Sequence, residues 1–197
     1  MNRSIRYQLG IPEDCRQKAA QLYAEAFSQK FMPIIGSKEK LIGILYDAIK
    51  PECGIAALKD EQLVGLCGFY HNGISFTAGM SSSVIIKHLG YIKGTWAILL
   101  LWILYERKPA AGELWMDGIV VDTDMRGKGV GRNILEQLNS FAKEKRYKCI
   151  KLDVIDTNNR AKKLYESQGF VETKTSYHPY LKPFFGFSAS ATMIKSL

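Results

Sequence analysis

Met125-Arg126-Gly127-Lys128-Gly129-Val130-Gly131-Arg132 is the stretch of sequence around which the chain is organised. It follows an apolar run, Leu114 to Val121, that is typical of a strand. The apolar residues that come after it recur at helical spacing: Val130, Ile134, Leu138 and Phe141. The predicted order is therefore a strand, a glycine-rich turn and a helix.

The glycine-rich turn has the properties of an anion site. Unpaired N–H groups and the positive end of a helix dipole meet there beside Arg126, Lys128 and Arg132, which favours a phosphate or pyrophosphate. A P-loop is excluded because Gly127-Lys128 is followed by Gly129 and not by a hydroxyl residue. The glycine spacing also differs from that of a Rossmann fingerprint. From the loop alone, an ordinary helix cap is an equally good interpretation.

Two segments resemble the signatures of one protein family. Arg126-x-x-Gly129-x-Gly131 is similar to the Q/R-x-x-G-x-G/A pattern of the GNAT superfamily of acyl-CoA-dependent N-acyltransferases, in which this loop wraps the CoA pyrophosphate. Asn158 to Phe170 resembles the second signature, N-x-x-A-x-x-x-Y-E-x-x-G-F. The two occur at the expected separation, and the close match covers residues 114–170. The resemblance implies an α/β (α+β) fold with a mixed, mostly antiparallel central sheet flanked by helices.

The resemblance also implies a site for acetyl-CoA as co-substrate, with no metal. Its expected cofactor-binding residues lie on the fourth strand, the glycine loop and the second signature: Ile119, Val120, Val121, Arg126, Gly127, Lys128, Gly129, Val130, Gly131, Asn158, Ala161 and Tyr165. Asn158 would contact CoA, although capping the next helix is its alternative role. Tyr165 would face the thioester sulfur, although a packed core aromatic is the commoner fate of such a residue.

The chemistry of acetyl transfer suggests the catalytic residues. An amine that attacks a thioester expels a thiolate whose thiol pKa is about 8.5, and a tyrosine of pKa about 10 can protonate it, so Tyr165 is the candidate acid. A carboxylate must take a proton from the attacking ammonium group. Asp153 and Asp117 are the two candidates, and each has a solvated charge at a strand edge as its alternative interpretation.

The expected fourth strand, residues 113–122, changes its side-chain alternation part-way along. Leu114 and Met116 share one phase, whereas Ile119 and Val121 share the other, and Gly118 lies at the change. A glycine at a phase change predicts a β-bulge, although a plain core strand with a flexible glycine is the alternative. In the family this strand splays from its neighbour and pairs with the pantetheine arm, here through Ile119 and Val121.

The remaining elements are expected from local patterns. Strands are predicted at residues 5–9, 54–58, 63–70, 149–154, 171–177 and 189–194. A helix starts at Pro12 and its apolar stripe is broken by Phe31 to Gly36, and a second helix spans Leu41 to Ile49. The aromatic loop before the last strand is expected either to form the acceptor mouth or to pack on an insertion, through Tyr177, His178, Tyr180 and Phe184.

An insertion at about residues 71–110 precedes the fourth strand. Its run from Trp96 to Tyr105 is apolar on every face but shorter than the roughly 20 residues of a transmembrane helix. A buried or homodimer-forming helix is favoured over membrane contact because Lys93 and residues 106–108 bracket the run with charge. In a GNAT protein such an insertion would shape the acceptor side.

Composition agrees with one soluble domain, residues 1–197. The net charge of +8 favours an anionic ligand, but the basic residues are spread along the chain, which disfavours a nucleic-acid-binding protein. The four scattered cysteines suggest neither a disulfide framework nor a zinc site, and a cytoplasmic protein without a signal peptide is expected. We therefore expect an acetyl-CoA-dependent N-acetyltransferase that uses a primary amine by direct transfer in a ternary complex. A non-catalytic acyl-CoA-binding or regulatory module is the alternative, which the presence of Tyr165 disfavours.

Overall fold

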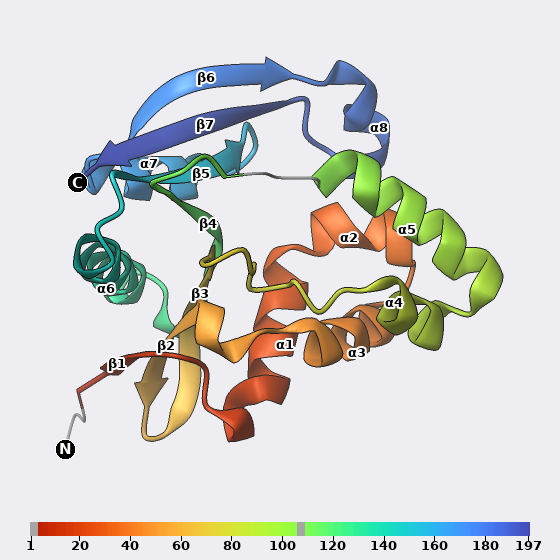
Figure 1. Ribbon diagram of the computed structural model, residues 1–197, viewed down its shortest axis with the longest axis horizontal. Helices are drawn as coiled ribbons and strands as arrows, with labels where there is room; N and C mark the ends of the chain where they lie inside the picture. Colours follow the sequence, from red (N-terminus) through yellow and green to blue (C-terminus); the bar gives the residue numbers. More distant parts are fainter. Residues whose placement is uncertain (1–3, 106–108) are drawn as a thin grey trace.

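The structure is a computed structural model that describes residues 4–105 and 109–197, without the side chains of residues 102–105. Its centre is a seven-stranded sheet of order β1-β2-β3-β4-β5-β7-β6 (Figure 1). Each neighbouring pair is antiparallel except β4 and β5, which run parallel. The strands are β1 Arg6–Leu9, β2 Gly54–Lys59, β3 Gln62–Tyr70, β4 Glu113–Val121, β5 Cys149–Ile155, β6 Val171–Tyr177 and β7 Ala189–Ser196. The expected mixed, mostly antiparallel sheet is confirmed.

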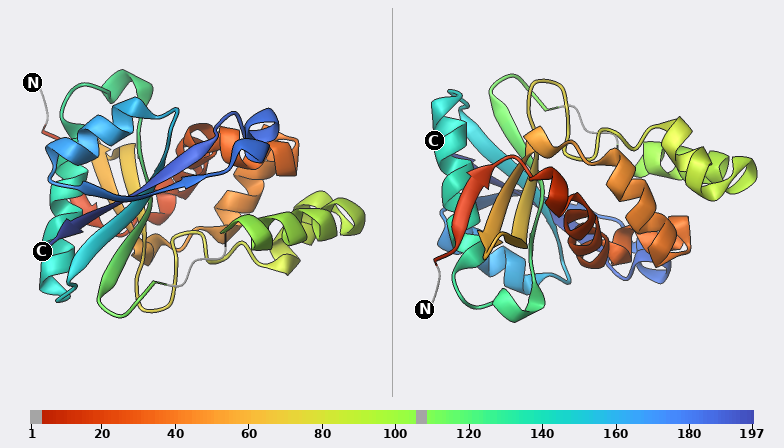
Figure 2. Two further views of the ribbon diagram at one scale, coloured as in Figure 1. Left: turned by 90° about the horizontal axis from the view of Figure 1, so that it is seen from above. Right: turned by 90° about the horizontal axis from the view of Figure 1, so that it is seen from below.

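Helices cover both faces of this sheet. They are α1 Arg16–Ala26, α2 Ser28–Ile35, α3 Lys38–Ala48, α4 Ser82–Leu89, α5 Tyr91–Tyr105, α6 Val130–Glu144, α7 Asn159–Ser167 and α8 Lys182–Phe185. The core is divided by the sheet: one apolar cluster joins α1 to α5 with one face, and a second joins α6 and Tyr165 with the other (Figure 2). The apolar stripe predicted after the glycine loop is the buried face of α6.

The expected break at Phe31 to Gly36 is wrong. The chain forms α2 across this segment, with Pro33 inside the helix, and ends it at Gly36, whose φ is 77°. Phe31 and Ile35 are one helical turn apart and are both buried. Burial of this pair outweighs the backbone hydrogen bond that proline removes, which a local pattern does not reveal.

The predicted β-bulge in β4 is confirmed. Gly68 of β3 pairs with Gly118, whereas Phe69 pairs with Met116, so Asp117 is an extra residue without a register partner. As a result the side chains before and after the bulge pack against the same apolar cluster, the one that contains α6. Leu114 and Met116 lie before the bulge and Ile119 and Val121 after it, although Met116 and Ile119 are separated by an odd number of positions.

The parallel strands β4 and β5 separate soon after they meet. They pair only from Glu113–Cys149 to Trp115–Lys151, while β5 pairs with β7 along its whole length. Beyond Trp115 the two strands diverge (Figure 1). The splayed strand pair that the family resemblance implied is therefore present.

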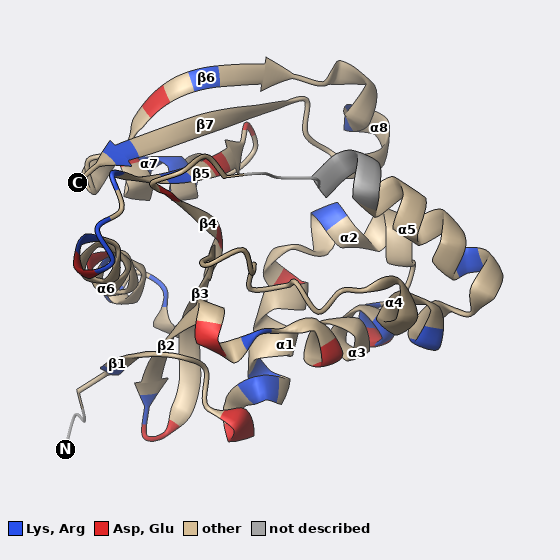
Figure 3. Ribbon diagram, viewed as in Figure 1, with Lys and Arg blue, Asp and Glu red and all other residues tan. Residues whose placement is uncertain are grey.

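The helical insertion before β4 consists of α4 and α5. Helix α5 packs through Ala97 and Leu101, but it leaves a set of large apolar side chains exposed: Tyr91, Ile92, Trp96, Leu99 and Leu100. Residues 71–105 contain no acidic residue, and Lys87 and Lys93 are their basic residues (Figure 3). No helix among the described residues is long and apolar enough to cross a membrane.

Candidate active site

The glycine loop forms a cradle of backbone N–H groups at the start of α6. Gly127 and Gly129 have φ of 79° and 81°, a left-handed conformation that favours glycine, and Gly129 caps the helix. The first backbone hydrogen bond of α6 is donated by the Asn133 N–H to the Gly129 carbonyl, at 3.1 Å. Within the described chain, no hydrogen bond uses the N–H groups of residues 127–132. This geometry suits an anion.

The glycines of the loop have different surroundings. A Cβ on Gly127 or Gly129 would meet no atom within 4 Å, whereas a Cβ on Gly131 would lie 3.3 Å from the Leu164 side chain. Gly127 and Gly129 therefore leave open space above the cradle, and Gly131 allows α6 to approach α7. The buried side chain of Val130 belongs to the core, so only its N–H is directed to the cradle.

The edge of β4 that faces away from β3 continues from this loop. The Asp122 N–H donates to the Val64 carbonyl at 2.9 Å, and the alternation of an antiparallel ladder then directs the backbone groups of Val120 to β3. The backbone groups of Ile119 and Val121 point to the opposite side, where β5 has diverged. The Arg126 Nε atom donates to the Val121 carbonyl at 3.1 Å, which fixes the arginine beside this edge.

The three candidate catalytic residues come together where β4 and β5 separate. A small cavity of about 110 Å³ is lined by Tyr165 of α7, Asp153 of β5 and Asp117 of the β4 bulge. Besides Tyr165, three of the expected cofactor residues line the same cavity: Ile119, Asn158 and Ala161. Residues from three separate elements thus meet at one point.

Tyr165 is almost completely buried and packs against Phe170, with ring centroids 5.8 Å apart. Burial raises the pKa of the Tyr165 hydroxyl above its usual value, and the nearby Cys67 raises this pKa further. The phenol therefore keeps its proton at neutral pH. Asn158 performs its structural role as well, since its side-chain oxygen accepts from the Ala161 N–H at 3.1 Å and caps α7.

The two carboxylates are held differently. Asp153 accepts a hydrogen bond from the Thr192 hydroxyl of β7 at 2.8 Å. Asp117 accepts from the N–H of Phe76 at 3.0 Å, and Phe76 is fully buried in the loop that follows β3. The Phe76 ring lies over Gly68, where a Cβ would approach it to 2.6 Å. The loop between β3 and α4 therefore helps to position Asp117.

A second, larger cavity of about 460 Å³ adjoins the first and shares Phe27, Lys30 and Asp117 with it. Sequence reasoning missed the aromatic residues of its wall, because Tyr23 and Phe27 belong to an apolar helix stripe that predicts only core packing. The aromatic loop is different: Tyr177, Tyr180 and Phe184 are exposed and line neither cavity. In the described part of the chain, no cluster of three or more His, Cys, Asp or Glu side chains is placed to hold a metal ion.

Comparison with known proteins identifies the family. The sequence model of the acetyltransferase (GNAT) family matches residues 16–170. The chain belongs to this family. GNAT acetyltransferases use acetyl-CoA, and the loop cradle and β4 edge described above lie in the part of this GNAT protein that the family model covers.

Two curated relatives match a shorter segment of this GNAT protein. They are a probable spermine N(1)-acetyltransferase of Bacillus subtilis subsp. natto (strain BEST195) and a spermine/spermidine N(1)-acetyltransferase of Bacillus subtilis (strain 168). Each is 34% identical over 68 residues, which is 34% of this chain and 44% of the relative. The match spans less than half the length of either relative, so their substrates are not transferred to this chain.

Solved structures agree with the GNAT fold. A crystal structure of an acetyltransferase has a TM-score of 0.71 at 22% identity, covering 97% of this chain and 98% of the other. An N-acetyltransferase from Staphylococcus aureus Mu50 has a TM-score of 0.66 at 12% identity, covering 96% of this chain and 100% of the other. At these identities the likeness establishes the fold alone.

Proposed function

We propose that this protein is an acetyl-CoA-dependent N-acetyltransferase that moves an acetyl group to a primary amine by direct transfer in a ternary complex. One observation carries the proposal: Tyr165, Asp117 and Asp153 line one cavity at the point where β4 and β5 separate. We further infer that residues 1–197 form one acetyltransferase domain with an insertion at about 71–110. Cytoplasmic localisation stays a prediction.

The residues around the split fit acetyl-CoA. The N–H groups of residues 127–131, together with Arg126 and Lys128, would hold its pyrophosphate. The outward-facing backbone groups of Ile119 and Val121 would pair with the pantetheine arm, and Asn158 and Ala161 would lie beside it. When bound there, the co-substrate supplies an acetyl thioester.

The chain's own residues supply the proton transfers. Tyr165, a phenol at neutral pH, donates a proton to the departing sulfur. A carboxylate accepts a proton from the acceptor's ammonium group, directly or through water, so that the nitrogen can attack. Asp117 and Asp153 are both candidates, and we place Asp117 first because it lines the larger cavity as well as the smaller one.

Thiol release is the direct test. The protein is incubated with acetyl-CoA and a panel of primary amines, and amine-dependent release of free CoA is expected. Calorimetry measures acetyl-CoA binding in parallel. Tight acetyl-CoA binding with no amine-dependent thiol release would favour the non-catalytic acyl-CoA-binding or regulatory module, and absence of acetyl-CoA binding would overturn both interpretations.

A further inference from the structure

The larger cavity has the size of a small-molecule site. Its volume of about 460 Å³ lies within the usual range of roughly 300–1,000 Å³ for ligand pockets. Tyr23, Phe27 and Phe31 form one side, and the insertion helices contribute Ile85, Ile98 and Leu101 on the other. Asp117 lies where this cavity meets the smaller one. This larger cavity, called the chamber below, has aromatic and aliphatic walls. A molecule bound in it extends to the candidate catalytic residues.

The aromatic side of the chamber is tightly organised. Tyr23 and Phe27 have ring centroids 4.4 Å apart, and the Tyr23 centroid is 5.4 Å from that of Phe76. The Phe27 ring lies directly over Gly118, where a Cβ would come within 2.1 Å of its Cζ atom. An aromatic ring is thus fixed beside the residue that follows Asp117.

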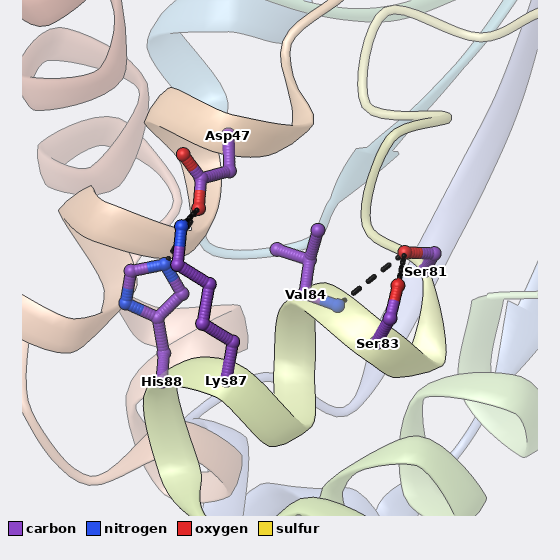
Figure 4. Close-up of polar contacts among 6 residues, drawn as sticks. All are labelled: Asp47, Ser81, Ser83, Val84, Lys87 and His88. Carbon is purple, nitrogen blue, oxygen red and sulfur yellow. Dashed lines mark hydrogen bonds and ion pairs between the residues drawn. The ribbon is translucent and has the colours of Figure 1, made fainter.

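The opposite wall is fixed to the rest of the fold. The Asp47 Oδ2 atom on α3 accepts hydrogen bonds from Lys87 Nζ at 2.8 Å and from His88 Nε2 at 2.9 Å, so α4 is tied to α3 (Figure 4). The Ser81 hydroxyl caps α4 by accepting from the Val84 N–H at 3.4 Å (Figure 4). The chamber is therefore largely preformed, as small-molecule sites usually are.

The charge of the lining limits the ligand. Asp117 is the single carboxylate among the described lining residues, and Lys30 is their single ammonium group. The other polar lining residues carry hydroxyl groups. A polyamine brings two or more positive charges at neutral pH, and Asp117 is the one carboxylate that the described lining offers to compensate them. A single ammonium group near Asp117, on an apolar body, matches the lining.

We propose that this cavity is the acceptor site and that its acceptor is an arylalkyl monoamine: one primary amine on a short apolar chain with an aromatic ring. The inference rests on the proposed acetyltransferase function. Asp117 takes one proton from the ammonium group, the freed amine nitrogen bonds to the acetyl carbon and the carbon–sulfur bond breaks. Tyr165 protonates the departing sulfur, and the second proton that the nitrogen loses as the amide forms restores the Tyr165 phenol. The ring occupies the chamber between Phe27 and Ile98. This acceptor differs from the polyamines for which the two curated relatives are named.

The test uses 2-phenylethylamine and spermidine as paired probes with the full chain and acetyl-CoA. We expect kcat/KM for 2-phenylethylamine to exceed that for spermidine by about tenfold or more, the discrimination that an apolar pocket provides. Ile98→Trp fills the chamber and should raise KM for 2-phenylethylamine by about tenfold or more while leaving acetyl-CoA affinity unchanged. Leu99→Trp is the matched control on the exposed side of α5, and it should change neither value.

Two results would overturn the inference and leave the acetyltransferase proposal intact. One is a higher kcat/KM for spermidine than for 2-phenylethylamine. The other is a KM for 2-phenylethylamine that Ile98→Trp leaves unchanged in a folded protein. If no amine is acetylated, the proposed function fails. Calorimetry with 2-phenylethylamine and the CoA-loaded protein then decides the inference: binding that Ile98→Trp abolishes supports the chamber as an amine site, and absence of binding refutes it.

Discussion

Tyr165 carries the most specific chemical expectation in this chain. Its phenol is buried in the apolar cluster under α6, where a phenolate charge is poorly solvated, and this raises its pKa above the usual value of about 10. A raised pKa favours the protonated form, so the phenol holds a transferable proton at all pH values below about 10. Ionisation of Tyr165 should therefore cause no loss of activity between neutral pH and that limit.

Replacing Tyr165 by Phe tests its role as the acid. The substitution keeps the ring that packs on Phe170 and removes only the hydroxyl. We expect kcat to fall by about 10²–10⁴, the usual effect of a placed acid, with CoA affinity nearly unchanged by calorimetry. Loss of CoA binding would instead make Tyr165 a cofactor contact, and full activity would mean that solvent protonates the thiolate.

Gly118 of β4 leaves the space that the Phe27 ring occupies. In Gly118→Ala the new Cβ would lie 2.1 Å from the ring, so the ring or the strand must move. We expect a loss of about 1–3 kcal/mol in the free energy of unfolding, measured with urea. The control is a double-mutant cycle with Phe27→Ala, in which the two effects should be coupled by about 0.5 kcal/mol or more. Strict additivity would show that the two positions do not contact each other.

Helix α4 should become less firmly attached in acid. Hydrogen bonds from Lys87 and then His88 lower the pKa of Asp47 below its usual value of 3.8. A lowered folded-state pKa adds stability that is present above the unfolded-state value and is lost as the pH falls through the folded-state value. Asp47→Asn should therefore cost about 1 kcal/mol at pH 7 and progressively less below pH of about 4.

Urea denaturation between pH 2.5 and 7 measures this difference for Asp47→Asn. Glu144→Gln is the matched control, because Glu144 and Lys145 form an exposed ion pair that should contribute little. A difference between wild type and Asp47→Asn that stays constant with pH would rule out the ionic anchor.

The exposed side of α5 leads us to expect a homodimer. Trp96, Leu99 and Leu100 are 67%, 47% and 40% exposed, on a helix for which the sequence predicted either burial or a homodimer contact. A second copy of the chain would cover them.

Light scattering should give twice the mass of 22.2 kDa, and the double variant Trp96→Lys, Leu100→Lys should give the mass of the monomer. Lys93→Gln, on the same helix, is the control for a change of charge and should stay dimeric. A wild-type monomer would refute the dimer, and binding to anionic liposomes would assign the face to membranes.

Much of the fold was predictable because its signals are local. The loop glycines, the α6 stripe and the phase change at Gly118 each lie within one short segment, and the fold confirms the elements they predict. Helix α2 was missed because its stability comes from burial of its residues Phe31 and Ile35 against the rest of the fold, which the local sequence around Pro33 does not reveal. The acceptor chamber was also hidden, since Tyr23 and Phe76 meet only in the folded chain and Asp117 receives its hydrogen bond from a residue 41 positions away. The roles of Tyr165, Asp117 and Asp153 stay predictions.

The short pairing between β4 and β5 has a consequence for amide hydrogen exchange. The N–H groups of Ile119 and Val121 face the gap that opens after Trp115, whereas those of Val120 and Asp122 are bonded to β3. Solvent deuterium should therefore replace the first pair of protons quickly and the second pair slowly, so that adjacent residues of one strand alternate in protection. A ligand that pairs with this edge would erase the alternation, which makes these two amides a built-in reporter of occupancy.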